Sequence, residues 1–229
     1  MLRSLGRSFR ARETYGPKAT ATPLVDGALV KPKSLGLMEA KAARLLLRAR
    51  AVGAEADLKA SVERVLEKAA SQLADAIRAG QEGQLAGLGV HGDTRYYPIV
   101  VTYEPLPAHP FALELYDRIL YREGRLCGAN VRAVTMMNTR DVESLEAIIG
   151  EGEEWPDFLS RKHTPRYQYL PFHNYVYERF VGEVPKNPYL AARWRRVGEM
   201  IGMRLFAEPL AVAEPPPPRR RRGRRGRRR

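Results

Sequence analysis

The sequence has little cysteine: Cys127 is the single thiol among 229 residues. One thiol cannot close an internal disulfide, and it cannot supply a zinc site built from cysteines. Because disulfides belong to oxidising compartments, the chain suits a reducing one, and we expect a cytoplasmic protein. Long apolar runs are also missing. No stretch approaches the roughly 18 residues of a membrane span, so we expect no membrane partner.

Several catalytic patterns are missing as well. The four histidines are His91, His109, His163 and His173. They show no ligand spacing, and we expect each in a loop or on the surface. Ser61 and Ser71 have no recognisable histidine and aspartate arrangement, which argues against a hydrolase triad. The glycines of residues 81–95 do not form a phosphate-binding fingerprint and predict a flexible loop.

Positive charge is concentrated at the end of the chain. The formal net charge is +13, and nine arginines lie in the last eleven residues, which leaves about +4 for the rest. They are Arg219, Arg220, Arg221, Arg222, Arg224, Arg225, Arg227, Arg228 and Arg229. Together with four preceding prolines they predict a disordered tail over 209–229. Such arginine density binds polyanions through counterion release, so nucleic acid is the expected partner. The alternative is a solubilising or idle terminus.

Helical periodicity is clearest over residues 57–79, where apolar residues fall on one face and charges on the other. Gly80 is expected to cap this helix at its carboxyl end. Thr139 is expected to cap a helix at its amino end. Further helices are expected over 111–123, 140–149, 154–162 and 188–206, with a short amphipathic one over 3–12. An organellar presequence is the alternative interpretation of residues 1–13.

The strongest predicted strand covers residues 96–104, because aromatic and β-branched residues dominate the run. Its continuous apolar character predicts burial on both sheet faces. Other strands are expected over 22–31, 35–43 and 130–137. Strands and helices thus alternate after residue 35, which predicts an α/β fold with a mixed central sheet flanked by helices.

The spacing of three polar residues suggests a metal-binding catalytic site. If 35–43 is a strand, Glu39 and Lys41 project from the same face, since side chains at i and i+2 do so. If the strand ending at Asp26 pairs with it, the carboxylates of Asp26 and Glu39 approach each other. Two adjacent carboxylates repel unless a cation lies between them, and Mg²⁺ prefers such oxygen ligands. Lys41 could then orient a water or neutralise charge in a transition state.

Asp26 is followed by twelve residues and then by Glu39-Ala40-Lys41. This spacing resembles the signature of the PD-(D/E)XK nuclease superfamily. The long helix after this motif and the buried strand after the helix resemble the superfamily's restriction-endonuclease-like core. The resemblance implies that Asp26, Glu39 and the Ala40 carbonyl bind Mg²⁺ or Mn²⁺, and that Lys41 is catalytic. Gln72 would correspond to the helix glutamine of RecB-like members.

The resemblance covers roughly residues 1–104 and has departures. Glu13 would match an acidic residue that some members carry near the end of their first helix. Proline does not directly precede the aspartate, because the segment reads Pro23-Leu24-Val25-Asp26. Ala76 stands where RecB-like members have a tyrosine. We therefore expect a nuclease-like core over 1–104, an α/β extension packed on it over 105–208, and the tail over 209–229.

Two stretches allow a second interpretation. Residues 36–50 could instead form one amphipathic helix, with Glu39 and Lys41 solvated and Asp26 in a turn. The tyrosines and phenylalanines of residues 165–182 alternate with basic residues and could stack on unpaired bases. Packing onto the sheet is the favoured interpretation of that stretch.

Three functions follow from these patterns. The first is a Mg²⁺-dependent enzyme that hydrolyses phosphodiester bonds in DNA, in preference to RNA. The second is a non-catalytic nucleic-acid-binding or interaction protein on a degenerate version of the same fold. The third is a structural protein whose arginine tail is its active element. A homodimer is left open.

Overall fold

The computed structural model describes residues 8–11, 13–15, 22–41, 55–181 and 183–200. The chain forms two compact units, residues 1–188 and 189–229. In the second unit the structure describes a helix, α7 (Pro188–Met200), where a helix over 188–206 was predicted. The arginine-rich segment 209–229 lies outside the described residues.

The first unit contains strands and helices in alternation. Its strands are β1 (Phe9–Ala11), β2 (Thr14–Tyr15), β3 (Thr22–Pro23), β4 (Gly27–Lys31), β5 (Ser34–Lys41), β6 (Arg95–Thr102) and β7 (Thr135–Asn138). Its helices are α2 (Glu55–Gln81), α3 (Pro110–Leu120), α4 (Thr139–Gly150), α5 (Trp155–Lys162) and α6 (Phe172–Arg179). Two short 3₁₀ helices are η3 (Ala86–Leu88) and η4 (Arg122–Gly124).

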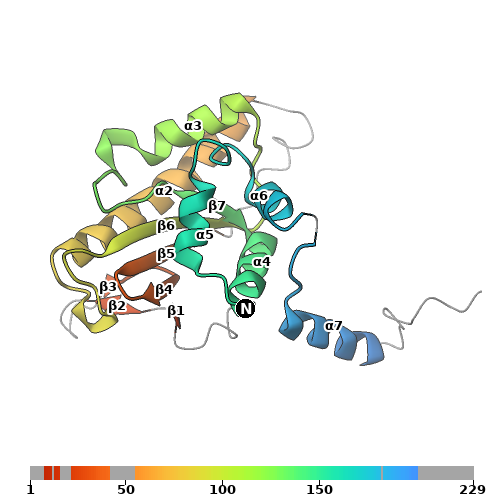
Figure 1. Ribbon diagram of the computed structural model, residues 1–229. Helices are drawn as coiled ribbons and strands as arrows, with labels where there is room; N and C mark the ends of the chain where they lie inside the picture. Colours follow the sequence, from red (N-terminus) through yellow and green to blue (C-terminus); the bar gives the residue numbers. More distant parts are fainter. Residues whose placement is uncertain (1–7, 12, 16–21, 42–54, 182, 201–229) are drawn as a thin grey trace, which may run out of the picture. The chain divides into compact units, whose positions relative to one another are not determined.

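Five strands form one mixed sheet in the order β1-β4-β5-β6-β7 (Figure 1). β1, β4 and β5 are antiparallel neighbours, whereas β5, β6 and β7 run parallel. A two-residue turn at Pro32 and Lys33 joins β4 to β5, and Lys33 adopts a left-handed φ of 60°. The crossover between β5 and β6 carries α2. The predicted α/β class, with a mixed sheet between helices, is therefore confirmed.

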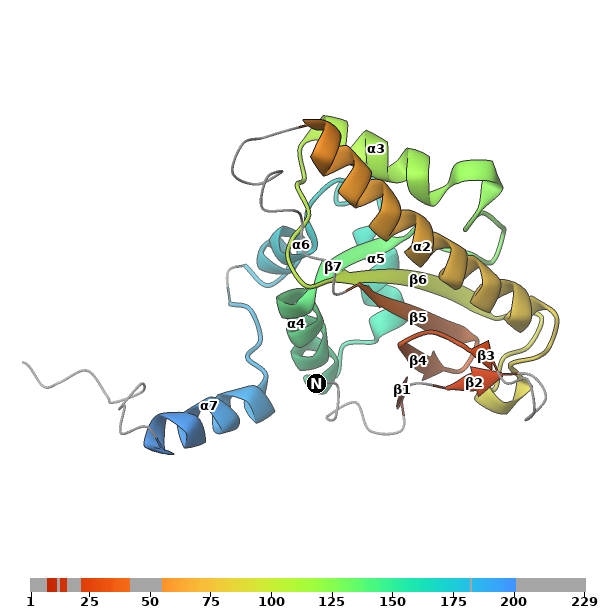
Figure 2. The ribbon, with the colours of Figure 1, turned by 180° about the vertical axis from the view of Figure 1, so that it is seen from behind.

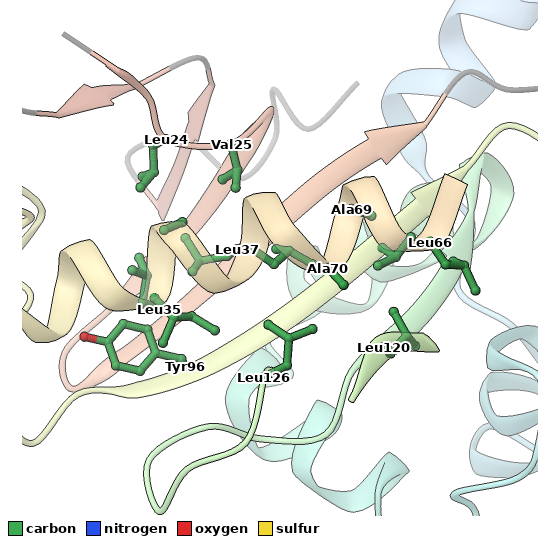
Figure 3. Packing of buried hydrophobic residues seen from close by; sticks show 14 of the residues in the cluster. Leu24, Val25, Leu35, Leu37, Leu66, Ala69, Ala70, Tyr96, Leu120 and Leu126 are labelled. Carbon is green, nitrogen blue, oxygen red and sulfur yellow. The ribbon is translucent and has the colours of Figure 1, made fainter. Parts of the chain in front are cut away.

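Helices cover both faces of the sheet (Figures 1 and 2). Leu35 and Leu37 of β5 belong to the apolar cluster that contains residues of α2 and α3. Met38 belongs to the other cluster, which contains residues of α4, α5 and α6. Because side chains alternate along a strand, Glu39 and Lys41 project toward the α2 face. Figure 3 shows Leu35, Leu37 and Tyr96 beneath α2.

The strand interpretation of the Glu39 segment is confirmed. Residues 36–41 lie in β5, so the alternative helix over 36–50 is wrong for that part, and its remainder lies outside the described residues. Residues 34–38 pair with both β4 and β6, and residues 39–41 continue the pairing with β6, so ladder hydrogen bonds outweigh the helix propensity of this segment.

Three expectations of local structure are wrong. Residues 9–11 of the expected first helix form β1, because β4 offers them an antiparallel partner. Gly80 lies inside α2 rather than capping it, and its lack of a side chain lets Tyr96 pack closely: a Cβ there would lie 2.6 Å from Tyr96 Oη. Asn138, one residue before Thr139, caps α4 and forms a capping box with Asp141.

The residues after 104 help to build both apolar clusters of the first unit. Ile119 and Leu120 of α3 pack with the α2 cluster, while Trp155 and Phe158 of α5 pack with the opposite one. Of the aromatic stretch 165–182, Phe172 and Tyr175 are buried and Tyr167 and Phe180 pack against their cluster, as the packing interpretation expects. Tyr169 and Tyr177 remain exposed.

The length and hydropathy of a helix decide whether it can span a membrane. Among the helices that the structure describes, none is long and apolar enough to cross a bilayer.

Candidate active site

The tight β4–β5 hairpin brings Asp26 to the end of β5. Gly27 pairs with Met38, so Asp26 lies one residue beyond that pair, opposite Glu39. Asp26 is exposed, in a bend directly before β4, and its Oδ2 accepts a hydrogen bond of 2.9 Å from the Ala40 amide. The predicted approach of the two segments is thus seen. The paired strand begins after Asp26, however, and does not end at it as expected.

Glu39 and Lys41 form a buried ion pair on the α2 face of β5. The Lys41 Nζ donates to Glu39 Oε1 at 2.6 Å, and the two side chains are only 11% and 4% exposed, respectively. The same ammonium donates to Gln72 Oε1 on α2. Gln72 therefore reaches the site across the crossover helix, and three polar side chains meet inside an otherwise apolar layer.

Glu39 has an unfavourable position for a carboxylate. Burial raises its pKa above the ordinary value, and the negative charge of Asp26 raises it further. The hydrogen bond and charge of Lys41 lower the pKa of Glu39, but burial outweighs them. One ammonium thus faces two carboxylates, so the end of β5 carries excess negative charge that a second cation would relieve.

The backbone of Ala40 adds an oxygen to this group. In an antiparallel ladder the N–H and C=O of one residue point toward the same neighbouring strand. Since the Ala40 N–H points at Asp26, the Ala40 carbonyl faces the same side. β4 pairs with β5 only as far as Met38, so this carbonyl lies past the end of the β4–β5 ladder.

Glu13 and the arginines of residues 219–229 complete the set of predicted site residues. Glu13 lies between β1 and β2 and not in a helix, which corrects that expectation. Its carbonyl accepts the Leu24 amide at 2.8 Å, two residues before Asp26. Arg219–Arg229 lie outside the described residues.

Two carboxylates and a carbonyl are a donor set that suits Mg²⁺ or Mn²⁺, which takes oxygen ligands and keeps several waters. The described residues contain no group of three or more His, Cys, Asp or Glu side chains that could hold a metal ion. Any ion here would therefore depend on Asp26, Glu39 and backbone or water oxygens. A structural role for the Glu39–Lys41 pair is the competing interpretation.

A cavity of about 360 Å³ lies where β6 and β7 end. Its lining includes Thr102, Asn138, Asp141, Lys162 and His163. The Lys162 Nζ donates to the carbonyls of Tyr167 and Gln168 at 2.9 and 3.0 Å. No pattern in the sequence indicates this cavity, since its walls come from segments that are far apart along the chain.

His163 lies in the turn directly after α5, which agrees with the loop expectation, but it is partly buried and not on the open surface. Its Nε2 lies 2.8 Å from Thr135 Oγ1, in a partly buried position at the end of α5. Burial, together with the nearby charge of Lys162, lowers the pKa of His163 to about 4. The ring is therefore neutral at physiological pH.

The chain matches no family model, no curated protein and no solved structure.

Proposed function

We propose that this protein hydrolyses phosphodiester bonds in DNA with the help of Mg²⁺ or Mn²⁺, on a restriction-endonuclease-like core. Asp26 and Glu39 would hold the ion together with the Ala40 carbonyl, and Lys41 would be the catalytic lysine. The observation that carries the proposal is the position of Lys41. Its ammonium lies between Glu39 and Gln72, beside a second carboxylate, in a largely buried layer.

The order of the elements around these residues supports the proposal. β4 and β5 form a hairpin, α2 crosses over the sheet, and β6 returns parallel to β5. This order is similar to the strand–strand–helix–strand core of the PD-(D/E)XK superfamily. Asp26, Glu39, Lys41 and Gln72 also fall at the positions that the resemblance implies.

The chemistry assigned to each side chain follows from its charge. A divalent ion bound here would supply Lewis acidity and lower the pKa of a water. Lys41 carries a positive charge close to the place where a phosphate oxygen gains negative charge, and it stabilises that charge. Gln72 holds the ammonium in place, since its Oε1 accepts a hydrogen bond from Nζ.

The test is cleavage of plasmid and single-stranded DNA by the full chain in Mg²⁺ or Mn²⁺. We expect cleavage by the wild-type protein and a loss of about 10²- to 10⁴-fold in Lys41→Ala, the range for removing one positioned catalytic group. The matched control is Lys68→Ala, which removes an exposed lysine from α2 and should leave the rate unchanged.

Two outcomes would contradict the proposal. Absence of cleavage by the folded wild-type protein on both substrates removes the enzymatic function. Cleavage that survives Lys41→Ala assigns the reaction to other residues. Far-UV circular dichroism of each variant separates lost chemistry from a lost fold.

A non-catalytic nucleic-acid-binding protein is the second candidate, and the arginines of the last eleven residues favour it. Deleting residues 215–229 should then weaken DNA binding and flatten its dependence on salt. Each phosphate contact that is lost reduces the slope of log K against log salt by about 0.9 for duplex DNA. An unchanged affinity and slope would show that the tail plays no electrostatic part.

A further inference from the structure

The cavity at the ends of β6 and β7 lies beside the proposed active site. Lys41 pairs with Thr102, and Thr102 pairs with Asn138, in the registers of the two parallel ladders. Both Thr102 and Asn138 line the cavity. Neighbouring strands are about 4.8 Å apart, so the cavity begins one strand away from the backbone of Lys41.

The walls of the cavity are suited to a flat ring. Leu106, Tyr116, Leu170 and Phe172 provide apolar and aromatic surface. Tyr169 also lines the cavity and is 65% exposed, which leaves its ring available for stacking. A volume of about 360 Å³ falls within the range of small-molecule sites. An unpaired base is a ligand of this shape.

The charges inside the cavity favour a neutral, hydrogen-donating ligand over a phosphate. The buried Asp141 carboxylate accepts the Asn138 amide at 2.9 Å through Oδ2, and a carboxylate has further acceptor sites. Two of the three donors of Lys162 are occupied by the carbonyls of Tyr167 and Gln168. Lys162 keeps its positive charge, because its two carbonyl acceptors are neutral, and Asp141 in the same cavity opposes it, so an anion gains little net attraction, whereas an amino group would be a good partner for Asp141.

From this geometry we propose that the cavity holds an unpaired nucleobase that carries an exocyclic amino group. Adenine, cytosine and guanine carry one, and thymine does not. The proposal deepens the proposed function and rests on it: it makes the preferred substrate single-stranded or locally unpaired DNA. Tyr169 stacks on the base, and Asp141 accepts from its amino group.

The test measures binding of the full chain to short, labelled single-stranded oligomers of one base each, in EDTA so that no cleavage occurs. High salt weakens the electrostatic binding of the arginine tail. We expect adenine and cytosine oligomers to bind more tightly than thymine oligomers. Tyr169→Ala should weaken binding of the adenine and cytosine oligomers about 5- to 150-fold, the range for one base–aromatic stack.

The matched control is Tyr177→Ala, which removes a similarly exposed tyrosine that lies on α6 and does not line the cavity. This variant should bind like the wild type. A second variant, Ala133→Trp, places a large ring in the cavity at an exposed position and should weaken binding as Tyr169→Ala does. Thermal unfolding of each variant verifies the fold.

The outcomes separate this proposal from the nuclease assignment. Equal binding by Tyr169→Ala, Ala133→Trp and Tyr177→Ala overturns the base site, whatever cleavage shows. Thymine oligomers that bind as tightly as the others overturn the assigned base class. Weakened binding in the cavity variants, together with cleavage that does not depend on Lys41, keeps the base site and rejects the proposed catalytic residues.

Discussion

The side chains of Lys41 and Lys162 are both largely buried, and they are held in different ways. Lys41 at the end of β5 donates to the Glu39 carboxylate and to an uncharged amide, that of Gln72. Lys162 at the end of α5 is 5% exposed and donates to two backbone carbonyls. Burial lowers the pKa of Lys162 to about 8. One ammonium therefore balances an acidic group, and the other is solvated by the backbone.

This difference marks Lys41 as a candidate catalytic residue and Lys162 as a structural contact. At Lys41 the ammonium pairs with Glu39 while the charge of Asp26 also acts on that carboxylate, so a ligand can change the balance of charge. At Lys162 the acceptors are neutral and fixed, and the bonds tie the end of α5 to residues 167 and 168. The loop held in this way continues into Tyr169. The second lysine thus positions part of the cavity wall.

The largest expected effect comes from separating the charges at Lys41. Lys41→Met leaves the buried Glu39 carboxylate without its ion-pair partner, which should lower the free energy of unfolding by about 3–5 kcal/mol. The double variant Glu39→Gln with Lys41→Met should recover most of that loss, because no buried charge remains. Urea unfolding of the single and double variants measures both values.

Additive losses in the double variant would contradict this prediction, since they would mean that Glu39 and Lys41 do not act on each other. The exposed pair of Lys33 and Asp93, at 2.8 Å, provides the control. Lys33→Met should leave the free energy of unfolding nearly unchanged, because water and salt screen an exposed pair.

A smaller effect is expected from a divalent cation. If Asp26 and Glu39 bind Mg²⁺ or Mn²⁺, a concentration 100 times the Kd should stabilise the fold by about 2.7 kcal/mol. Asp26→Asn should abolish most of this gain. Because Asp26 is exposed, the substitution should leave the metal-free stability nearly unchanged. Thermal unfolding with the ion and with EDTA measures the difference.

The stabilisation of the fold by the divalent cation should depend on pH. The pKa of Glu39 is raised, so its protonated form is favoured in the folded protein, and ionisation costs stability as pH rises through that pKa. The cation binds the ionised form and should therefore stabilise the protein more at pH 8 than at pH 5. Equal stabilisation at both values would place the ion away from Glu39.

Sequence reasoning found the Lys41 site because its parts are local. The two-residue turn after β4 fixes the register of Asp26 against Glu39, and strand alternation fixes the face of Lys41. Gln72 is expected only from the resemblance, and the crossover helix that covers that face carries it to Lys41. Two of the expectations that failed involve residues that suit more than one role: Asn138 and Thr139 can both cap a helix, and Gly80 serves for close packing as well as for a cap. The third, the helix expected over residues 3–12, failed because β4 offers residues 9–11 a strand partner.

The surroundings of Lys162 could not be predicted in this way. Arg161-Lys162 looks in the sequence like any basic end of a helix. Its burial depends on the loop of residues 163–171 folding back over α5, and the cavity needs that loop together with the ends of β6 and β7. These contacts are tertiary, and no periodic pattern encodes them. The burial of the neutral His163 ring likewise depends on tertiary contacts that no periodic pattern encodes.

The smallest expected effect is the pH dependence that Lys162 contributes. Its pKa is about 8 in the folded protein and 10.5 in the unfolded chain, so between these values the unfolded state binds more protons and stability rises with pH. The carbonyls of Tyr167 and Gln168 offset part of the cost of burying the ammonium. We therefore expect a rise of about 1 kcal/mol, which Lys162→Met should remove.

Urea unfolding at pH 8 and at pH 10 measures this rise. Lys68→Ala is the control, because an exposed lysine has nearly the same pKa in both states and should leave the rise intact. A Lys162→Met variant that keeps the full rise would show that Lys162 stays as well solvated by its two carbonyls as by water. Lys162 would then differ from Lys41, whose partner is charged, only in the kind of acceptor. It would not differ in the free-energy cost of burying the ammonium.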